Sequence, residues 1–193
     1  MAKKKVGIQP QAFTRSYNGI SKVLTCTVHI TEYDPKNQRP TPTIRNIEAI
    51  IDTGAMGTVI TEKLAKDANL TPSGKMYVKG AYTPEPKLTS TYLVNIFLPS
   101  RVSFVGTKVT ESESLVGGYD ILIGMDIITS GDLAVTNLNG KTKVSFQNPS
   151  THDIDFAKEI NRVINERQIK ERLKGNRANY NKSIKKGKRR KKR

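Results

Sequence analysis

The chain has 193 residues and a mass of 21.5 kDa, which suits one domain with a modest core and appended segments. No apolar run is long enough to span a membrane, and residues 1–13 lack the apolar stretch of a signal peptide, so the expected location is cytoplasmic. Cys26 is the only cysteine and there are two histidines, which excludes an intrachain disulfide and leaves a Cys/His zinc site short of ligands. We therefore expect no metal site.

The formal net charge of +16 is concentrated at the two ends of the chain. Residues 175–193 contain ten Lys and Arg, residues 3–5 contain three, and neither segment has an acidic residue. The rest of the chain is nearly balanced, with 20 basic and 17 acidic residues. A bound nucleic acid would therefore be contacted nonspecifically by the tail at 175–193 and not by the folded part. The alternative is a tail that only increases solubility.

The first half of the chain predicts strands followed by one short helix. Residues 23–30 alternate apolar and polar side chains, the period-two pattern of a half-buried strand. Residues 31–43 are polar and contain prolines, which favours a loop, and residues 44–51 form an apolar strand. Thr61 can then cap a short helix at 62–68.

The second half predicts two hairpins and further strands. Residues 74–91 have strand-like residues around Gly80 and two prolines, as in a long hairpin. Residues 133–146 contain Asn139-Gly140 between alternating segments, which is typical of a tight two-residue hairpin turn. The other apolar runs are residues 92–98, 102–109 and 120–128. The chain up to this point is therefore expected to be mostly β.

The pattern changes after Pro149. Residues 149–174 place apolar side chains at near-helical spacing, with acids early and bases late, which predicts an appended amphipathic helix. Gly175 is expected to end this helix, and the basic tail at 175–193 has too few apolar residues to order itself. Residues 1–18 are interpreted as a basic and polar extension, which leaves 19–148 as the β domain.

One short motif stands out. Asp52-Thr53-Gly54-Ala55 follows the apolar pair Ile50-Ile51, and a second element, Leu122-Ile123-Gly124, ends 72 residues after Asp52, beyond the Gly-bearing hairpin. Together these elements resemble the retropepsin-like aspartic proteases, the family of retroviral proteases and their cellular and bacterial relatives. The resemblance covers roughly residues 19–146. It implies a closed, mostly antiparallel β-barrel and an aspartic endopeptidase without cofactor.

The chemistry of this family requires two carboxylates. One activates a water, and the other, protonated, polarises the peptide carbonyl; two acids a few ångströms apart share one proton because both cannot ionise. The chain has one Asp-Thr-Gly copy and is too short for two lobes. The resemblance therefore implies a homodimer with one Asp52 from each subunit on the two-fold axis.

The resemblance also assigns roles to the surrounding residues. Asp52 would be the catalytic acid and base, in an active-site loop that continues through Thr53, Gly54 and Ala55. Thr53 would hydrogen-bond across the axis, and Gly54 would let the backbone approach and orient the carboxylate. The remaining candidates are expected to contact or enclose a peptide substrate: Lys79, Gly80 and Ala81 near the tip of a flap, and Leu122, Ile123 and Gly124 beneath the loop.

The sequence also departs from the viral pattern. Many viral members pair an acid four residues after the catalytic Asp with an Arg after the second motif, whereas this chain has Met56 and Met125. Asp126 comes next, and it could accept backbone N–H bonds near the active loop. Two other interpretations are open: a catalytically silent retropepsin-like dimer that acts as a scaffold or as a nucleic-acid-binding adaptor through its tail, and a phosphate-binding turn of the actin-like kinase type.

Overall fold

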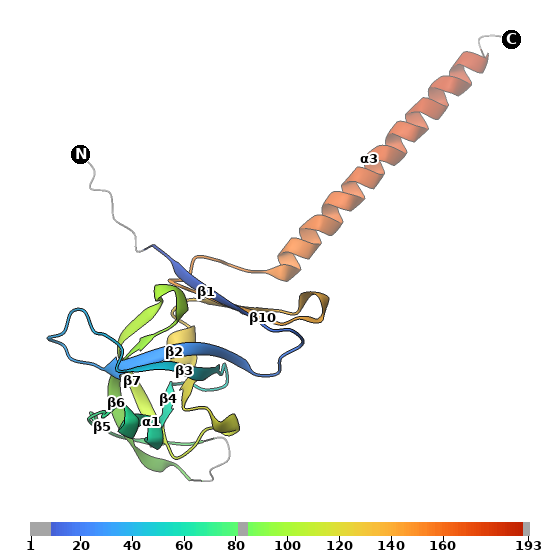
Figure 1. The fold of residues 1–193 in the computed structure, drawn as a ribbon. Helices are drawn as coiled ribbons and strands as arrows, with labels where there is room; N and C mark the ends of the chain where they lie inside the picture. Colours follow the sequence, from blue (N-terminus) through green and yellow to red (C-terminus); the bar gives the residue numbers. More distant parts are fainter. Residues whose placement is uncertain (1–8, 81–84, 191–193) are drawn as a thin grey trace, which may run out of the picture. The chain divides into compact units, whose positions relative to one another are not determined.

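The computed structural model describes residues 9–80 and 85–190, and within helices and strands it describes side chains up to residue 175. The chain divides into two compact units, residues 1–151 and 152–193. Among the described residues, the strands all lie in unit 1, and unit 2 contains one long helix (Figure 1). Among the helices of the described residues, none is both long and apolar enough to cross a membrane.

The centre of unit 1 is a closed β-barrel. Its seven-stranded sheet has the order β2-β3-β8-β4-β7-β6-β5, and an additional pairing of β2 with β6 closes six of these strands into a ring. Strand β5 extends the sheet outside the ring by pairing with β6. The strands are β2 (Leu24–Glu32), β3 (Ile44–Ile51), β4 (Val59–Thr61), β5 (Gly74–Val78), β6 (Lys87–Phe97), β7 (Ser103–Ser112) and β8 (Ile121–Ile123).

Two pairings in the barrel are parallel. Strand β3 pairs in parallel with β8, and β4 pairs in parallel with β7, while the other barrel pairings are antiparallel. The short strand β8 lies between β3 and β4, which are consecutive in sequence. The predicted closed, mostly antiparallel barrel is confirmed, and the segment that joins β3 to β4 passes over the end of β8.

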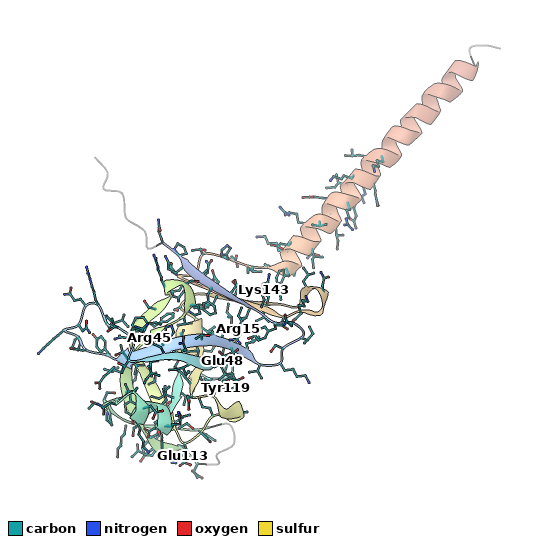
Figure 2. The ribbon with its side chains drawn as sticks, in the orientation of Figure 1. Arg15, Arg45, Glu48, Glu113, Tyr119 and Lys143 are labelled. Carbon is teal, nitrogen blue, oxygen red and sulfur yellow. The ribbon has the colours of Figure 1, made fainter. Side chains whose placement is uncertain are left out.

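A second, three-stranded sheet has the order β1-β10-β9 and is built from β1 (Gln11–Ser16), β9 (Asp132–Thr136) and β10 (Lys143–Asn148). Phe13 of β1 and Phe146 of β10 pack in the same buried core as the barrel strands. Arg15 of β1 forms an ion pair with Glu48 of β3, and the two side chains meet between the sheets in Figure 2. The two sheets therefore share one core.

The β domain starts earlier than predicted, at strand β1. Residues 1–18 were expected to be an extension, but Gln11–Ser16 pairs with β10 along its whole length. The sequence does not predict strand β1 because Phe13 is its only buried residue, and one buried apolar residue makes no alternating pattern.

Both predicted hairpins form. Strand β5 pairs with β6 from Gly74↔Thr91 to Val78↔Lys87, and β9 pairs with β10 from Asp132↔Gln147 to Thr136↔Lys143. The second turn is longer than the two residues expected, because residues 137–142 connect the strands through a 3₁₀ turn at Leu138–Gly140. Asn139 and Gly140 still adopt positive φ, as their type allows.

Short helices complete unit 1: α1 (Glu62–Asp67), α2 (Met125–Ile128) and the 3₁₀ turns Pro99–Arg101 and Val116–Gly118. The predicted cap of α1 is confirmed, because the Thr61 hydroxyl accepts a hydrogen bond from the Leu64 N–H at 3.1 Å. Helix α2 was not expected, since four residues after a strand are too few to show helical periodicity.

Unit 2 differs from the predicted pattern. Helix α3 runs from Phe156 to Arg190, so it starts later than residue 149 and continues through Gly175, where the sequence predicts its end and a disordered tail begins (Figure 1). A glycine costs a helix only about 1 kcal/mol relative to alanine, and the Lys and Arg residues that follow have high helix propensity. Phe156, Ile160 and Val163 on this helix are exposed.

The single cysteine lies deep in the barrel. Cys26 on β2 is 1% exposed, and burial raises the pKa of its thiol to about 12. The thiol is therefore neutral at physiological pH and packs as a small apolar side chain.

Gly131, between α2 and β9, has no room for a side chain. A Cβ atom at this position would lie 1.9 Å from the carbonyl oxygen of Gln147, so β10 would have to move. We expect Gly131→Ala to lower the free energy of unfolding by about 1–3 kcal/mol, measured by urea denaturation. Gly19→Ala is the matched control, because nothing lies within 4 Å of its Cβ position. Equal stability of the two variants would contradict this packing.

Candidate active site

Asp52 is positioned by the end of β3. The strand is buried at Ala49 and Ile51, and it pairs with β8 as far as Ile51↔Ile123. The Asp52 N–H then donates to the Ile123 carbonyl at 3.0 Å. The first residue after the strand is therefore still fixed to the barrel, while its half-buried side chain lies at the barrel's end.

The backbone of the following turn orients the carboxylate. The Gly54 N–H donates to Asp52 Oδ1 at 2.8 Å, and the Ala55 N–H approaches the Asp52 carbonyl oxygen at 3.4 Å. A Cβ atom at Gly54 would lie 3.2 Å from the same Oδ1, closer than an ordinary contact. Glycine at this position therefore lets the N–H approach the carboxylate, the role that the resemblance assigns to it.

Asp126 holds the far end of the loop. Its Oδ2 accepts from the Thr58 N–H at 3.0 Å, and its Oδ1 accepts from the Thr58 hydroxyl at 2.8 Å. The same hydroxyl oxygen accepts from the Gly124 N–H at 3.2 Å. The prediction that Asp126 accepts backbone N–H bonds near the loop is confirmed, and the loop is linked to the second motif through one buried threonine.

Helix α2 supplies a further set of backbone contacts. The Met125 N–H donates to the Ala55 carbonyl at 2.8 Å, and the Asp126 N–H donates to the Met56 carbonyl at 3.1 Å. Gly124 lies so close to the loop that a Cβ atom on it would be 2.5 Å from the carbonyl carbon and oxygen of Gly57. The loop 52–58 is thus fixed at both ends and along its middle.

The opposite side of the loop is open to solvent. Thr53 and Gly54 are exposed, and the Met56 side chain is 91% exposed. Thr53 and Met56 therefore form an exposed surface next to Asp52, polar at Thr53 and apolar at Met56.

The second motif has one side chain facing outward. Ile123 is 2% exposed and lies in the core, whereas Leu122 is half-buried, as expected for neighbouring residues on a strand. Of the two apolar residues predicted to enclose the site, Leu122 is the one that retains an accessible surface. Gly124 lies directly beneath the loop.

The structure describes only part of the predicted flap. Lys79 and Gly80 are exposed and follow β5, at the turn of the β5–β6 hairpin. Ala81 lies outside the described residues. Their role toward a substrate stays a prediction.

Sequence reasoning missed strand β4 and the contact of Gly57 with Gly124. Strand β4, Val59–Thr61, has only three residues, which is too few to show the alternation of a strand. The only signal for the glycine contact is the presence of Gly57 between Asp52 and Thr58, and a glycine in a loop has many explanations.

A comparison with known protein families matches the part of the chain that contains both motifs. Residues 44–127, from the start of β3 into α2, match a family model described as aspartyl protease. No curated protein matches the chain.

Several solved structures are similar to the chain at low identity. A retropepsin-like aspartic protease from Rickettsia conorii is 10% identical, with 72% of this chain and 96% of that chain covered and a TM-score of 0.45. The EIAV protease complexed with the inhibitor HBY-793 is 19% identical, with 58% and 89% covered and a TM-score of 0.38. The foamy viral protease-reverse transcriptase in complex with an RNA/DNA hybrid is 22% identical, with 55% and 11% covered and a TM-score of 0.38.

The matched segment contains both motifs, Asp52-Thr53-Gly54 and Leu122-Ile123-Gly124, together with Thr58 and Asp126 that link them. The predicted resemblance of this chain to the retropepsin-like aspartic proteases is thereby confirmed.

Proposed function

We propose that the protein is a homodimeric aspartic endopeptidase in which the Asp52 side chains of two subunits form the catalytic pair. The observation that carries the proposal is the fixed Asp52 loop, with the Gly54 N–H on the carboxylate and Asp126 holding its far end. An aspartyl protease match over residues 44–127 supports the reaction class.

The exposed surface of the loop supports the dimer. Thr53, Gly54 and Met56 are exposed in the single chain, and the sequence contains no second Asp-Thr-Gly that could complete a pair. A two-fold axis through this surface would bring the two Asp52 side chains together and cover the apolar Met56. Thr53 would then donate across the axis to the partner loop.

The proposed reaction is hydrolysis of a peptide bond with no nucleophilic side chain. The ionised Asp52 takes a proton from a water whose oxygen bonds to the carbonyl carbon, while the protonated partner Asp52 gives its proton to the carbonyl oxygen. The tetrahedral diol then collapses: the Asp52 that took the water's proton gives it to the amide nitrogen, the partner Asp52 takes a proton from a diol hydroxyl, the C–N bond breaks, and a carboxylic acid and an amine leave. One shared proton remains on the pair, so the site returns to its starting state.

The substrate is proposed to be an extended peptide segment. Leu122 and Met56 offer apolar surface beside the pair, and the β5–β6 hairpin, with Lys79, Gly80 and Ala81 at its turn, would close over the bound segment as a flap.

Replacing Asp52 tests the catalytic assignment. Asp52→Asn keeps the acceptor for the Gly54 N–H but cannot take a proton, so turnover of an unstructured peptide library should fall at least about a thousandfold. Light scattering should give the same mass for both proteins, twice the 21.5 kDa of one chain. Asp34→Asn, in the loop between β2 and β3, is the matched control and should retain activity. A fully active Asp52→Asn protein would remove the assignment; a folded, inactive wild-type dimer would favour the scaffold interpretation.

Mixing subunits tests whether the site is shared. When an equal amount of Asp52→Asn protein is added to a fixed amount of wild type and subunits exchange, about half of the wild-type chains enter mixed dimers. Because a mixed dimer has one carboxylate, peptide cleavage should fall to about half. Undiminished cleavage after verified exchange would show that each Asp52 acts without a partner.

The pH profile should reflect the pair. One member must be ionised and the other protonated, so kcat/KM should rise and then fall with pH, and a sigmoidal profile with one apparent pKa would contradict a shared proton. Peptide cleavage at constant ionic strength from pH 3 to about 8 measures it.

The Thr58 hydroxyl should stabilise the conformation of the Asp52 loop through its hydrogen bonds to Asp126 and Gly124. Thr58→Val keeps the shape but removes the acceptor of the buried Gly124 N–H and leaves Asp126 Oδ1 with the Ile127 N–H alone, which should cost about 1–3 kcal/mol of unfolding free energy and reduce cleavage. Thr58→Ser keeps the hydroxyl and should retain most activity. Urea denaturation and kcat/KM of both variants measure the effect, and equal losses would show that the methyl group matters and the hydroxyl does not.

A further inference from the structure

The two units of the chain differ sharply in charge. Residues 152–193 contain 16 of the 33 Lys and Arg but only 5 of the 17 Asp and Glu. This segment is a compact unit of its own, separate from the barrel that holds Asp52. Its charge is therefore not explained by the proposed peptidase site.

Charge is also unevenly distributed within α3. The three glutamates of the helix, Glu159, Glu166 and Glu171, all lie in its first half, each close in sequence to a Lys or Arg. After Glu171 the helix has no acidic residue. The second half of α3 therefore cannot neutralise itself by pairing within the helix.

The helical backbone organises these cations. The sequence predicts disorder beyond Gly175, but α3 is continuous to Arg190 (Figure 1). In a helix, positions i, i+3, i+4 and i+7 fall on one face, and Lys182, Lys185, Lys186 and Arg189 have this spacing. We call these four residues the basic face. They span about 10 Å of helix axis, at 1.5 Å per residue.

We propose that the basic face of α3 binds the sugar-phosphate backbone of double-stranded nucleic acid, without reading its sequence. A row of four cations over about 10 Å of helix axis can neutralise part of a polyanion that carries one charge per about 1.7 Å of duplex axis. An α-helix fits into the major groove of B-form DNA, which is about 12 Å wide, where its cations can reach the phosphates that flank the groove, whereas the major groove of A-form RNA is deep and narrow. B-form DNA is therefore the favoured duplex.

The composition of the helix argues against single-stranded targets. Proteins that bind single strands combine cations with aromatic side chains on which bases stack. The last part of α3 has one aromatic residue, Tyr180, and no tryptophan exists in the chain. Contacts to phosphates are therefore the interaction that this helix can make, and such contacts weaken steeply with salt because counterions are released.

The inference goes beyond the proposed peptidase and does not depend on it. The test therefore uses the full chain in the Asp52→Asn background, where cleavage cannot alter the protein, and repeats it with wild type. Binding of nucleic acid by both the Asp52→Asn and the wild-type protein would support the inference whether or not the chain is a peptidase.

The experiment measures binding to a fluorescent 24-base-pair DNA by anisotropy across a salt series, with the single strand and the RNA duplex of equal length as competitors. Replacing the basic face (Lys182, Lys185, Lys186 and Arg189→Gln) keeps helix propensity and should weaken binding at least about tenfold at low salt. It should also reduce the slope of log K against log salt by about three to four.

A matched control carries the same change in net charge elsewhere. Lys22, Lys36, Arg39 and Lys108 are exposed in unit 1, and their replacement by Gln removes three Lys and one Arg, as in the basic-face variant. This control should bind DNA like the parent protein, and circular dichroism should show equal helix content in all variants. Equal loss in both variants, preference for the single strand, or no binding of the DNA duplex at low salt would each overturn the proposal.

Discussion

The candidate site depends on the pairing of Asp126 with Thr58. Thr58 is 1% exposed, and its hydroxyl donates to Asp126 while accepting from Gly124. A buried hydroxyl without partners costs about 1–3 kcal/mol, so this arrangement is strongly preferred over one in which the two segments separate. The residues it joins are 68 positions apart, and together they fix where the chain turns back after Asp52.

The close approach of two glycines makes that pairing possible. Because Gly124 has no side chain, α2 starts directly against Gly57, and the N–H groups of Met125 and Asp126 reach the carbonyls of the Asp52 loop. Strand β8 needs only three residues to bring Gly124 there, since it is fixed between β3 and β4. The barrel topology thus converts two short motifs, distant in sequence, into one rigid support for a single carboxylate. An ion pair between the positions of Met56 and Met125 is not needed for this support.

The sequence predicts the β elements well where patterns are local. Strand β3, the Thr61 cap and the hairpin pairings follow from alternation, capping residues and turn residues, and the structure confirms them. Strand β1 was not predicted because Phe13 is its only buried residue, and strand β4 was not predicted because it has three residues. The prediction for the end of α3 was also wrong, because the Lys and Arg residues after Gly175 favour a helix more than one glycine opposes it. For the site, Asp52 and its glycine were predictable from the motif, whereas the geometry of Gly57 and Gly124 depends on distances that no local pattern encodes.

The buried thiol of Cys26 has a practical consequence. With the pKa of this thiol raised to about 12 and the side chain 1% exposed, the protein has no reactive sulfhydryl group in its native state. A cysteine introduced at any exposed position would therefore be the single target of a maleimide or nitroxide label, without removal of the native residue. Pulsed dipolar spectroscopy between two such labelled subunits could then report distances across an assembly directly in solution.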